Sequence, residues 1–402
     1  MTGTSTSQVR TGGMPRGLAR TGPILFSYGF RPFFLGGALW AIAAMVLWIA
    51  ALSGVVDFAT EYGAHHWHAH EMLFGYASAV LAGFLLTAVP NWTGRLPVSG
   101  WPLLGLFSLW ALGRIAFLAS DVIGVDLAVL ADMIFLPALL FICVREVVAG
   151  KKWNDLKVIA GLLALSIANA GFHYEVLMGD HPDRAYRLAI TAYVGLVMVI
   201  GGRIIPSFTR NWINKQGRTD FPVAYNRFDA SAIAIGIAAL GLWIALPDSR
   251  VTAIGAAAAA AFHAVRLLRW RGWTTAAEML VAVLHVAYVF VPLGFLAISL
   301  SAIDLVDPTS TLHVMTIGAV ATMMVAVMTR ATRGHTGRDL TASGLTTISY
   351  AAIVLCAFAR PAAGLLPDHA AEIYAVSGVL WLVAFGLFVV EYAPMLVRGR
   401  RW

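Results

Sequence analysis

Apolar runs long enough to cross a membrane recur along this 402-residue chain and alternate with short polar segments. Lipid offers no hydrogen-bond partner for exposed backbone groups, so a run of about 20 apolar residues that crosses the hydrocarbon core must be helical. Twelve runs meet this requirement. The pattern therefore predicts membrane-spanning helices at 33–53, 71–90, 102–119, 125–145, 157–177, 185–207, 229–246, 251–268, 276–299, 311–330, 345–366 and 372–395.

The composition agrees with an integral membrane protein. Hydrophobic residues make up 59% of the chain and charged residues only 12%, whereas soluble domains contain about 25% charged residues. The predicted fold class is all-α, a single polytopic bundle of twelve transmembrane helices formed by residues 23–402. Residues 1–22 are rich in Gly, Ser, Thr and Arg and contain no apolar stretch. They are expected to form a disordered cytoplasmic tail.

Basic residues are distributed unevenly between the two sets of loops. The net charge is +7, and 22 of the 28 lysines and arginines lie at the chain ends and in the loops on the same side as these ends. The positive-inside rule then places both termini in the cytoplasm. Nucleic acid is excluded as a partner because the basic residues do not form one stripe. The expected surroundings are a lipid bilayer, and the sequence leaves the oligomeric state open.

Histidines are concentrated at the predicted outer end of the second span. The segment His65-His66-Trp67-His68-Ala69-His70 contains four of the eleven histidines. Neutral imidazole is the commonest protein ligand of transition metals, and His66 and His70 share a helix face if the helix begins early. A metal or haem site at the bilayer surface is one interpretation, and a surface loop that chelates adventitious metal is the alternative.

Two further histidines are expected at the same depth. His173 lies near the outer end of the fifth span and His313 begins the tenth, whereas His285 lies near the middle of the ninth. Two imidazoles from different helices can hold an iron porphyrin between them, which favours His70 and His313 as haem ligands. Closely spaced imidazoles also suit copper. The candidate metal ligands are therefore His66, His68, His70, His173, His285 and His313.

Charged residues inside the predicted spans are also candidates for function, because such groups are costly in lipid. They are Arg114, Asp132, Arg203 and Glu391. Arg203 is expected either to pair with Glu391 or, like Arg114, to meet a haem propionate, since guanidinium suits carboxylate.

Three separated motifs identify a resemblance. Phe26-Ser27-Tyr28-Gly29-Phe30-Arg31-Pro32-Phe33-Phe34, His68-Ala69-His70-Glu71-Met72-Leu73-Phe74-Gly75-Tyr76 and Arg330-Ala331-Thr332-Arg333-Gly334-His335-Thr336-Gly337-Arg338 together resemble the NnrS family. The resemblance implies a bacterial inner-membrane protein that binds haem b and copper and acts in nitric oxide metabolism and resistance to nitrosative stress. The expected ligand is nitric oxide or a related nitrogen oxide, and Tyr28 and Arg31 of the first motif become candidate cofactor-binding residues. Whether the protein is an enzyme stays open.

The histidines near the outer ends of spans two and ten also resemble those of haem-copper oxidases and nitric oxide reductases. The tenth span lacks a His-x-His pair, however, so a copper site of that type is not expected. Related segments at 89–95, 205–210 and 331–333 favour three pseudo-repeats of four helices. Two other functions stay open, a copper or haem transporter or metallochaperone and a structural partner of a respiratory complex.

Overall fold

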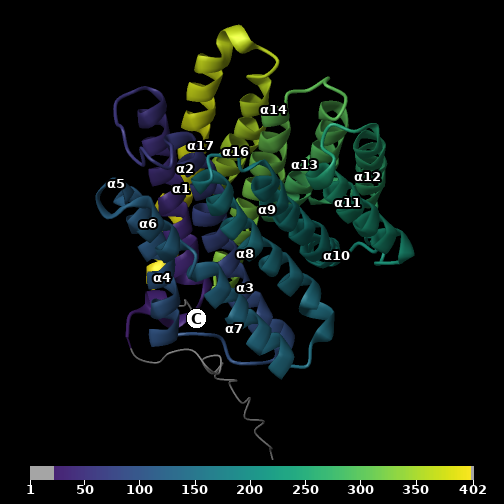
Figure 1. Cartoon of the computed structure of the whole chain (residues 1–402). Helices are drawn as coiled ribbons and strands as arrows, with labels where there is room; N and C mark the ends of the chain where they lie inside the picture. The colour runs from purple at the N-terminus through teal and green to yellow at the C-terminus, as the bar shows by residue number, and fades with distance from the viewer. Residues whose placement is uncertain (1–21, 400–402) are drawn as a thin grey trace, which may run out of the picture.

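Twelve helical segments that are long and apolar enough to cross a membrane make up the computed structural model, which describes residues 22–399 (Figure 1). This confirms the predicted all-α bundle and its twelve spans. All but the last residue of the predicted tail at 1–22 lies outside the described residues. The spans run over Phe30–Leu52, Ala64–Thr93, Trp101–Leu118, Val125–Ala149, Trp153–Leu177, Asp183–Lys215, Arg227–Ala245, Arg250–Leu268, Met279–Ser301, Pro308–His335, Gly344–Ala362 and Pro367–Val397.

Most spans are a single α-helix. These are α1 (Phe30–Leu52), α4 (Trp101–Leu118), α8 (Leu156–Leu177), α11 (Arg227–Ala245), α12 (Arg250–Leu268), α13 (Met279–Ser301), α16 (Gly344–Ala362) and α17 (Ala370–Val397). The fourth span is broken into α6 (Val125–Asp132) and α7 (Phe135–Ala149), and the short α5 (Ser120–Ile123) precedes it.

The second, sixth and tenth spans each contain a π-helical segment between two α-helices. They are α2 (Ala64–His70), η2 (Glu71–Tyr76) and α3 (Ala77–Thr93); α9 (Asp183–Leu196), η4 (Val197–Gly201) and α10 (Gly202–Lys215); and α14 (Pro308–His313), η6 (Val314–Ala321) and α15 (Thr322–His335). A π-turn every four spans is what a four-helix repeat would produce. The threefold repeat itself stays a prediction.

These three spans lie at the centre of the bundle. In their most apolar stretches 89%, 67% and 72% of the residues are buried, against 33% to 39% in every other span except the ninth. Helix α15 packs against α3, and α9 packs against both η2 and η6. The outer spans therefore surround a core built on the second, sixth and tenth.

Backbone carbonyl groups of the π-helical segment η2 accept hydrogen bonds from side chains of other spans. The Tyr193 hydroxyl donates to the Leu73 carbonyl at 2.7 Å, and Arg114 Nη1 donates to the Phe74 carbonyl at 3.0 Å. Backbone groups at membrane depth need such partners because lipid supplies none. Segment η2 is thereby attached to the third and sixth spans.

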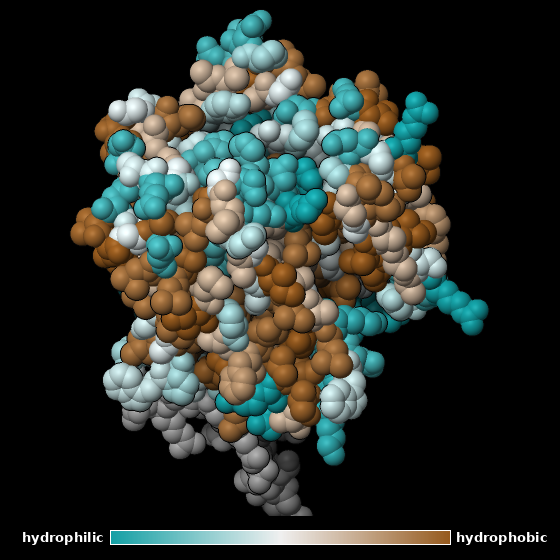
Figure 2. Space-filling view, viewed as in Figure 1, coloured by the Kyte–Doolittle hydropathy of each residue, from teal (hydrophilic) through white to brown (hydrophobic). Residues whose placement is uncertain are grey.

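The two described ends of the chain lie together on one side of the bundle (Figure 1). Arg31 Nη1 donates to the carbonyls of Leu396 at 2.6 Å and Arg398 at 2.8 Å, so it caps the C-terminal end of α17. Figure 2 shows that apolar residues dominate the middle of the face in view and that polar residues gather towards its two ends. The two described ends share one side, and the prediction that this side is cytoplasmic stays a prediction.

Candidate metal centre

Three ligand-type side chains from three different spans meet at one end of the bundle. His70 is the last residue of α2, Asp132 is the last residue of α6, and His173 lies near the end of α8. One ligand atom of each lies within 4.8 Å of the other two, and all three side chains are buried. They are called the His–Asp–His triad below. Because α6 ends at Asp132, this carboxylate lies at the break in the fourth span.

The carboxylate of Asp132 lies between the two imidazoles. Its Oδ2 is 3.0 Å from His173 Nε2 and 3.3 Å from His70 Nε2. The two imidazole rings are tilted by 39° with their centroids 4.6 Å apart. Two imidazole nitrogens and one carboxylate oxygen therefore face a common point.

Each imidazole is held through its other nitrogen or by a neighbouring amide. The Tyr62 hydroxyl is 2.9 Å from His173 Nδ1, and Glu71 Oε1 is 3.2 Å from His70 Nδ1. Asn169 Oδ1 is 2.9 Å from His70 Nε2. Such partners fix the orientation of ligating imidazoles in metal sites and raise their basicity.

Tyr62 precedes the second span, and burial is the main reason that the pKa of its hydroxyl lies well above the usual value. The charges of Asp132 and Glu71 raise the pKa further. Tyr62 therefore stays a neutral phenol, whose oxygen can accept a hydrogen bond from His173 Nδ1–H and leave Nε2 as the ligating nitrogen.

One guanidinium neutralises part of the negative charge around the triad. Arg114 forms ion pairs with Asp132 and, through Nε at 3.0 Å, with Glu71 Oε2. Trp40 Nε1 donates to the same Glu71 oxygen at 2.6 Å. Two buried carboxylates thus face one permanent cation, so a single negative charge is left for a proton or a metal ion to balance.

The donor set fits a divalent transition metal. In the arrangement without a metal, both nitrogens of His70 face oxygen acceptors, which a doubly protonated imidazolium satisfies. A divalent ion at His70 Nε2 would replace that proton while keeping the Nδ1 contact. Two histidines and one carboxylate that leave coordination positions open are the ligands of many mononuclear iron sites, and imidazole also suits copper and zinc.

A second group of histidines lies at the start of the same span. The His68 ring stacks on Trp48 with centroids 4.6 Å apart, and His65 meets Trp48 edge to face at 5.4 Å. His68 also interacts electrostatically with His313 and His65. We call His65, His68 and His313 the outer histidine cluster. His313 Nδ1 donates to the Thr309 carbonyl at 2.7 Å in the tautomer that leaves Nε2 free to ligate.

His66 contacts the outer histidine cluster only through His65, whose ring centroid is 6.4 Å away, and His285 belongs to neither group. His66 Nδ1 is 3.2 Å from the Tyr62 carbonyl, and its ring lies 6.2 Å from that of His181. His285 Nε2 is 2.8 Å from the Thr209 hydroxyl. The structure therefore brings His70 together with His173 and His68 together with His313, while His285 takes part in a helix-to-helix hydrogen bond.

The expected pairing of Arg203 with Glu391 is wrong. Arg203 Nη1 pairs with Asp155 at 2.9 Å, and Glu391 pairs with Arg333 at 2.6 Å. Each of the two residues pairs with a different residue that lies far from it in the sequence, and the spacing along the chain does not indicate such a pair.

The first motif also has a structural role in the described residues. Arg31 caps α17, and the Tyr28 ring packs against His335 at 5.5 Å and Phe30 at 5.5 Å. Burial raises the pKa of the Tyr28 hydroxyl. Arg114, predicted as a candidate for a haem propionate, is instead taken up by Asp132 and Glu71.

A haem held between His70 and His313 does not fit this arrangement. Both nitrogens of His70 face side-chain oxygens, and its ring is packed against Phe74 and Phe117 with centroids 5.2 and 5.1 Å away. Among the described contacts, none joins His70 to His313. The shared depth of the two residues stays a prediction, and their side chains contact different groups of residues.

Several partners of the triad were not among the predicted site residues. Asp132 was noted only as an embedded charge, and Tyr62, Glu71 and Asn169 were not predicted to contact it. The available signal was that Asp132 and His173 lie near the same ends of consecutive spans. Depth alone does not say which way each helix face points.

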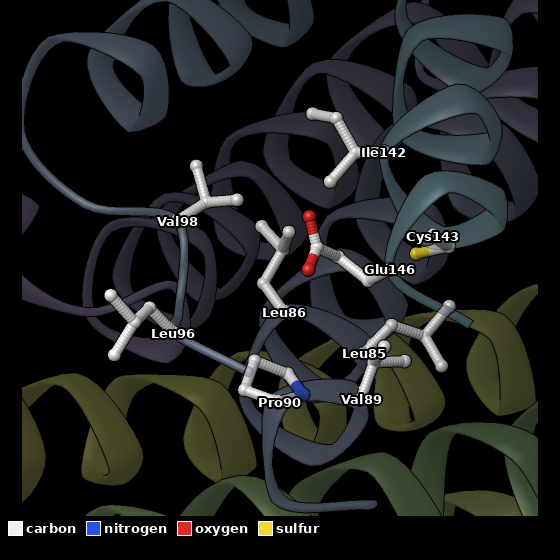
Figure 3. A pocket seen from close by; sticks show the side chains of 9 residues that line it. All are labelled: Leu85, Leu86, Val89, Pro90, Leu96, Val98, Ile142, Cys143 and Glu146. Atoms are coloured by element: carbon white, nitrogen blue, oxygen red, sulfur yellow. The ribbon is translucent and has the colours of Figure 1, made fainter. Parts of the chain in front are cut away.

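A small cavity of about 10 Å³ lies on the opposite side of the bundle from the triad, beside the loop that follows α3 (Figure 3). Its one charged lining residue, Glu146, pairs with Arg145 at 2.6 Å and with Arg95. The remaining lining residues are Leu85, Leu86, Val89, Pro90, Leu96, Val98, Ile142 and Cys143. The cavity is too small for a cofactor and is separate from the metal centre.

These features define a twelve-span, all-helical membrane protein with a buried group of two histidines and an aspartate near one membrane face. The family model described as NnrS protein matches residues 24–400. The chain therefore belongs to the NnrS family, which links it to the bacterial response to nitric oxide. No curated protein matches the chain.

Proposed function

We propose that this protein is a metal-containing inner-membrane protein of the nitric oxide response that binds nitric oxide or a related nitrogen oxide near the periplasmic face. The observation that carries the proposal is the His–Asp–His triad, whose ligand atoms lie within 4.8 Å of one another in the membrane-embedded part of the chain. Buried groups of this type in a membrane protein are costly and usually functional.

His70, Asp132 and His173 would hold the metal ion. When bound, the ion would supply an open coordination position for a small ligand. Glu71 and Tyr62 would keep the two imidazoles in place through their Nδ1 atoms. The ion pair between Arg114 and Asp132 would hold the carboxylate so that Oδ2 stays directed at the imidazoles.

The outer histidine cluster is proposed as a copper site, because imidazole suits copper and its three histidines interact electrostatically with one another. The family resemblance implies haem b as well. Because His70 does not fit as a haem ligand, no step of the proposed function is assigned to haem. The proposal places both termini in the cytoplasm, as the distribution of basic residues predicts.

The burial of the triad supports a resident metal centre over a transported ion. His70 has no exposed surface, and Asp132 and His173 are 4% and 1% exposed. Their hydrogen-bonded neighbours would have to move before an ion could leave. Metal uptake into proteoliposomes that depends on the triad would support the transporter alternative instead.

Metal analysis of the purified protein tests the proposal. We expect His173→Ala and Asp132→Asn variants to lose one tightly bound transition metal ion and to keep any copper bound at the outer histidine cluster. His263→Ala is the matched control, because His263 is equally buried but bonds to the Tyr288 hydroxyl at 2.9 Å, away from the triad. Equal metal content in the triad variants and in the control would refute the assignment. An absorbance spectrum with a Soret band that survives His70→Ala would confirm separately that any haem is held elsewhere.

A further inference from the structure

A cavity of about 70 Å³ lies where the second, sixth and tenth spans converge. It is called the central cavity below. Residues of α3, of the end of α9 with η4 and the start of α10, and of η6 with α15 contribute to its wall. The lining residues are Val80, Leu81, Phe84, Tyr193, Leu196, Val197, Ile200, Gly201, Ile204, Val320, Met323, Met324 and Val327.

The lining offers no strong hydrogen-bond partner to an occupant. Tyr193 has the only hydroxyl among these side chains, and that hydroxyl already donates to the Leu73 carbonyl at 2.7 Å. Water in a protein interior needs two to four polar partners, and cavities lined by apolar side chains stay dry and bind small apolar molecules. The central cavity is therefore suited to an uncharged apolar occupant.

The cavity is bounded on the side of the chain termini and has an apolar rim. The Arg330 guanidinium stacks over the Phe208 ring at 4.0 Å, about one helical turn beyond the cavity residues Val327 and Ile204. Four lining residues, Phe84, Val197, Ile204 and Val327, are half-buried and form the rim, while the other nine are buried. Ions and polar solutes would meet no favourable contact at this rim.

We propose that the central cavity binds an uncharged diatomic gas and holds it within the bundle, roughly 15 Å along the second span from His70, an inference that rests on the proposed function. A volume of about 70 Å³ is about half that of the roughly 150 Å³ apolar cavity that binds benzene or xenon in another protein. This is enough for a diatomic molecule. Tyr193 connects the two places, because it lines the cavity and bonds to Leu73, three residues after His70.

The cavity contains its own reporters, since Met323 and Met324 line it. The protein would be labelled with ¹³C at the methionine methyl groups, placed in lipid nanodiscs and studied by NMR under increasing pressures of xenon and of dioxygen. Met323→Leu and Met324→Leu assign the two resonances. We expect a saturable shift of these two resonances with xenon and a selective broadening with paramagnetic dioxygen.

A pair of substitutions in η4 provides the control. Val197→Phe places a larger side chain at the rim of the cavity, whereas Val199→Phe makes the same change in the same segment at a residue that does not line it. We expect Val197→Phe to abolish the saturable xenon shift and Val199→Phe to retain it. Equal responses of the two variants would overturn the proposal.

Two other results would also overturn it. One is a response to xenon that rises linearly and equally at Met323, Met324 and Met133, an exposed residue of the fourth span, which would indicate simple partition into the bilayer. The other is stronger broadening of Met323 and Met324 than of Met133 by lipids spin-labelled in the acyl chain, which would identify a lipid tail as the occupant.

Gas binding is measured without the metal, so its failure is distinguishable from failure of the proposed function. The His173→Ala variant, expected to lack the metal, should retain the saturable xenon shift. A protein that binds the metal but shows no such shift would refute only the cavity proposal.

Discussion

Replacing Gly75 by alanine should disturb the charged network around the metal centre without removing any of its members. A Cβ atom at this position would lie 2.8 Å from Trp40 Nε1 and 2.9 Å from Arg114 Nη1, and it would also overlap Glu71 Oε2. These three groups meet at the Glu71 carboxylate, which accepts from Trp40 at 2.6 Å and pairs with Arg114 Nε at 3.0 Å. The added methyl group must therefore displace at least one of them.

The cost follows from the contacts that would be lost. A hydrogen bond to a charged group contributes about 1.5–3 kcal/mol, and an extra methyl group in a packed interior costs about 1–3 kcal/mol. The better helix propensity of alanine returns up to about 1 kcal/mol. We therefore expect Gly75→Ala to lower the free energy of unfolding by about 1.5–6 kcal/mol. Reversible denaturant unfolding in mixed micelles would measure it, and metal analysis of the same sample would detect a weakened centre.

Gly105→Ala is the matched control, because Gly105 is on α4 and a Cβ there meets nothing within 4 Å. This variant should be as stable as the wild type or slightly more stable, with full metal content. The reasoning is refuted if Gly75→Ala unfolds within about 0.5 kcal/mol of the control, which is the range of ordinary surface substitutions.

Three further predictions concern other parts of the molecule. Arg31→Gln removes the charged cap of α17 and should lower the free energy of unfolding by about 2 kcal/mol; denaturant unfolding identical to that of the wild type would contradict the capping role. Hydrogen bonds from the Thr60 hydroxyl and backbone lower the pKa of Asp121 below its usual value. This interaction therefore stabilises the protein at pH values above the pKa of Asp121 in the unfolded chain, and the stabilisation is lost as the pH falls through the pKa of Asp121 in the folded protein. Stability measured against pH should accordingly fall less steeply below about pH 4 in Thr60→Val, and an unchanged slope would count against this. For the orientation, a membrane-impermeant thiol reagent added outside spheroplasts should label Asp180→Cys but not Lys215→Cys, since both native cysteines are buried; the reverse pattern would invert the topology.

The spans could be predicted from the sequence because their apolar length is a property of each segment alone. The predicted ends of the spans were less accurate where polar residues continue the helix. The second span was expected at 71–90 but begins at Ala64, since the histidine string is itself helical. The sixth was expected to end at 207 but continues to Lys215. Polar ends lie outside the hydrocarbon core, so hydropathy does not indicate how far the helix extends.

The metal centre could be predicted only in part. The positions of His70 and His173 along their spans predicted that both lie at the same end of the bundle. The direction in which each side chain points depends on how each helix is rotated against its neighbours, and hydropathy carries little information on this in a bundle buried on many sides. The pairing of His70 with Asp132 and His173, rather than with His313, therefore required the structure.

The π-helical segments explain why arginines lie deep in the bundle. A carbonyl released by the wider turn needs a donor, and a buried guanidinium that supplies one needs a carboxylate. Arg266 of the eighth span donates through Nη1 to the Met198 carbonyl of the sixth span at 2.9 Å. Its Nε pairs with Asp229 at 3.1 Å. Arg114 of the third span likewise donates to the Phe74 carbonyl of the second span, and it pairs with Asp132 of the fourth span. In both the sixth and the second span one backbone carbonyl thus holds an arginine, and that arginine pairs with an aspartate. The contacts from the Phe74 carbonyl through Arg114 lead to Asp132, whose carboxylate lies between the imidazoles of His70 and His173. The π-helical turn of the second span therefore also positions the candidate metal ligand Asp132.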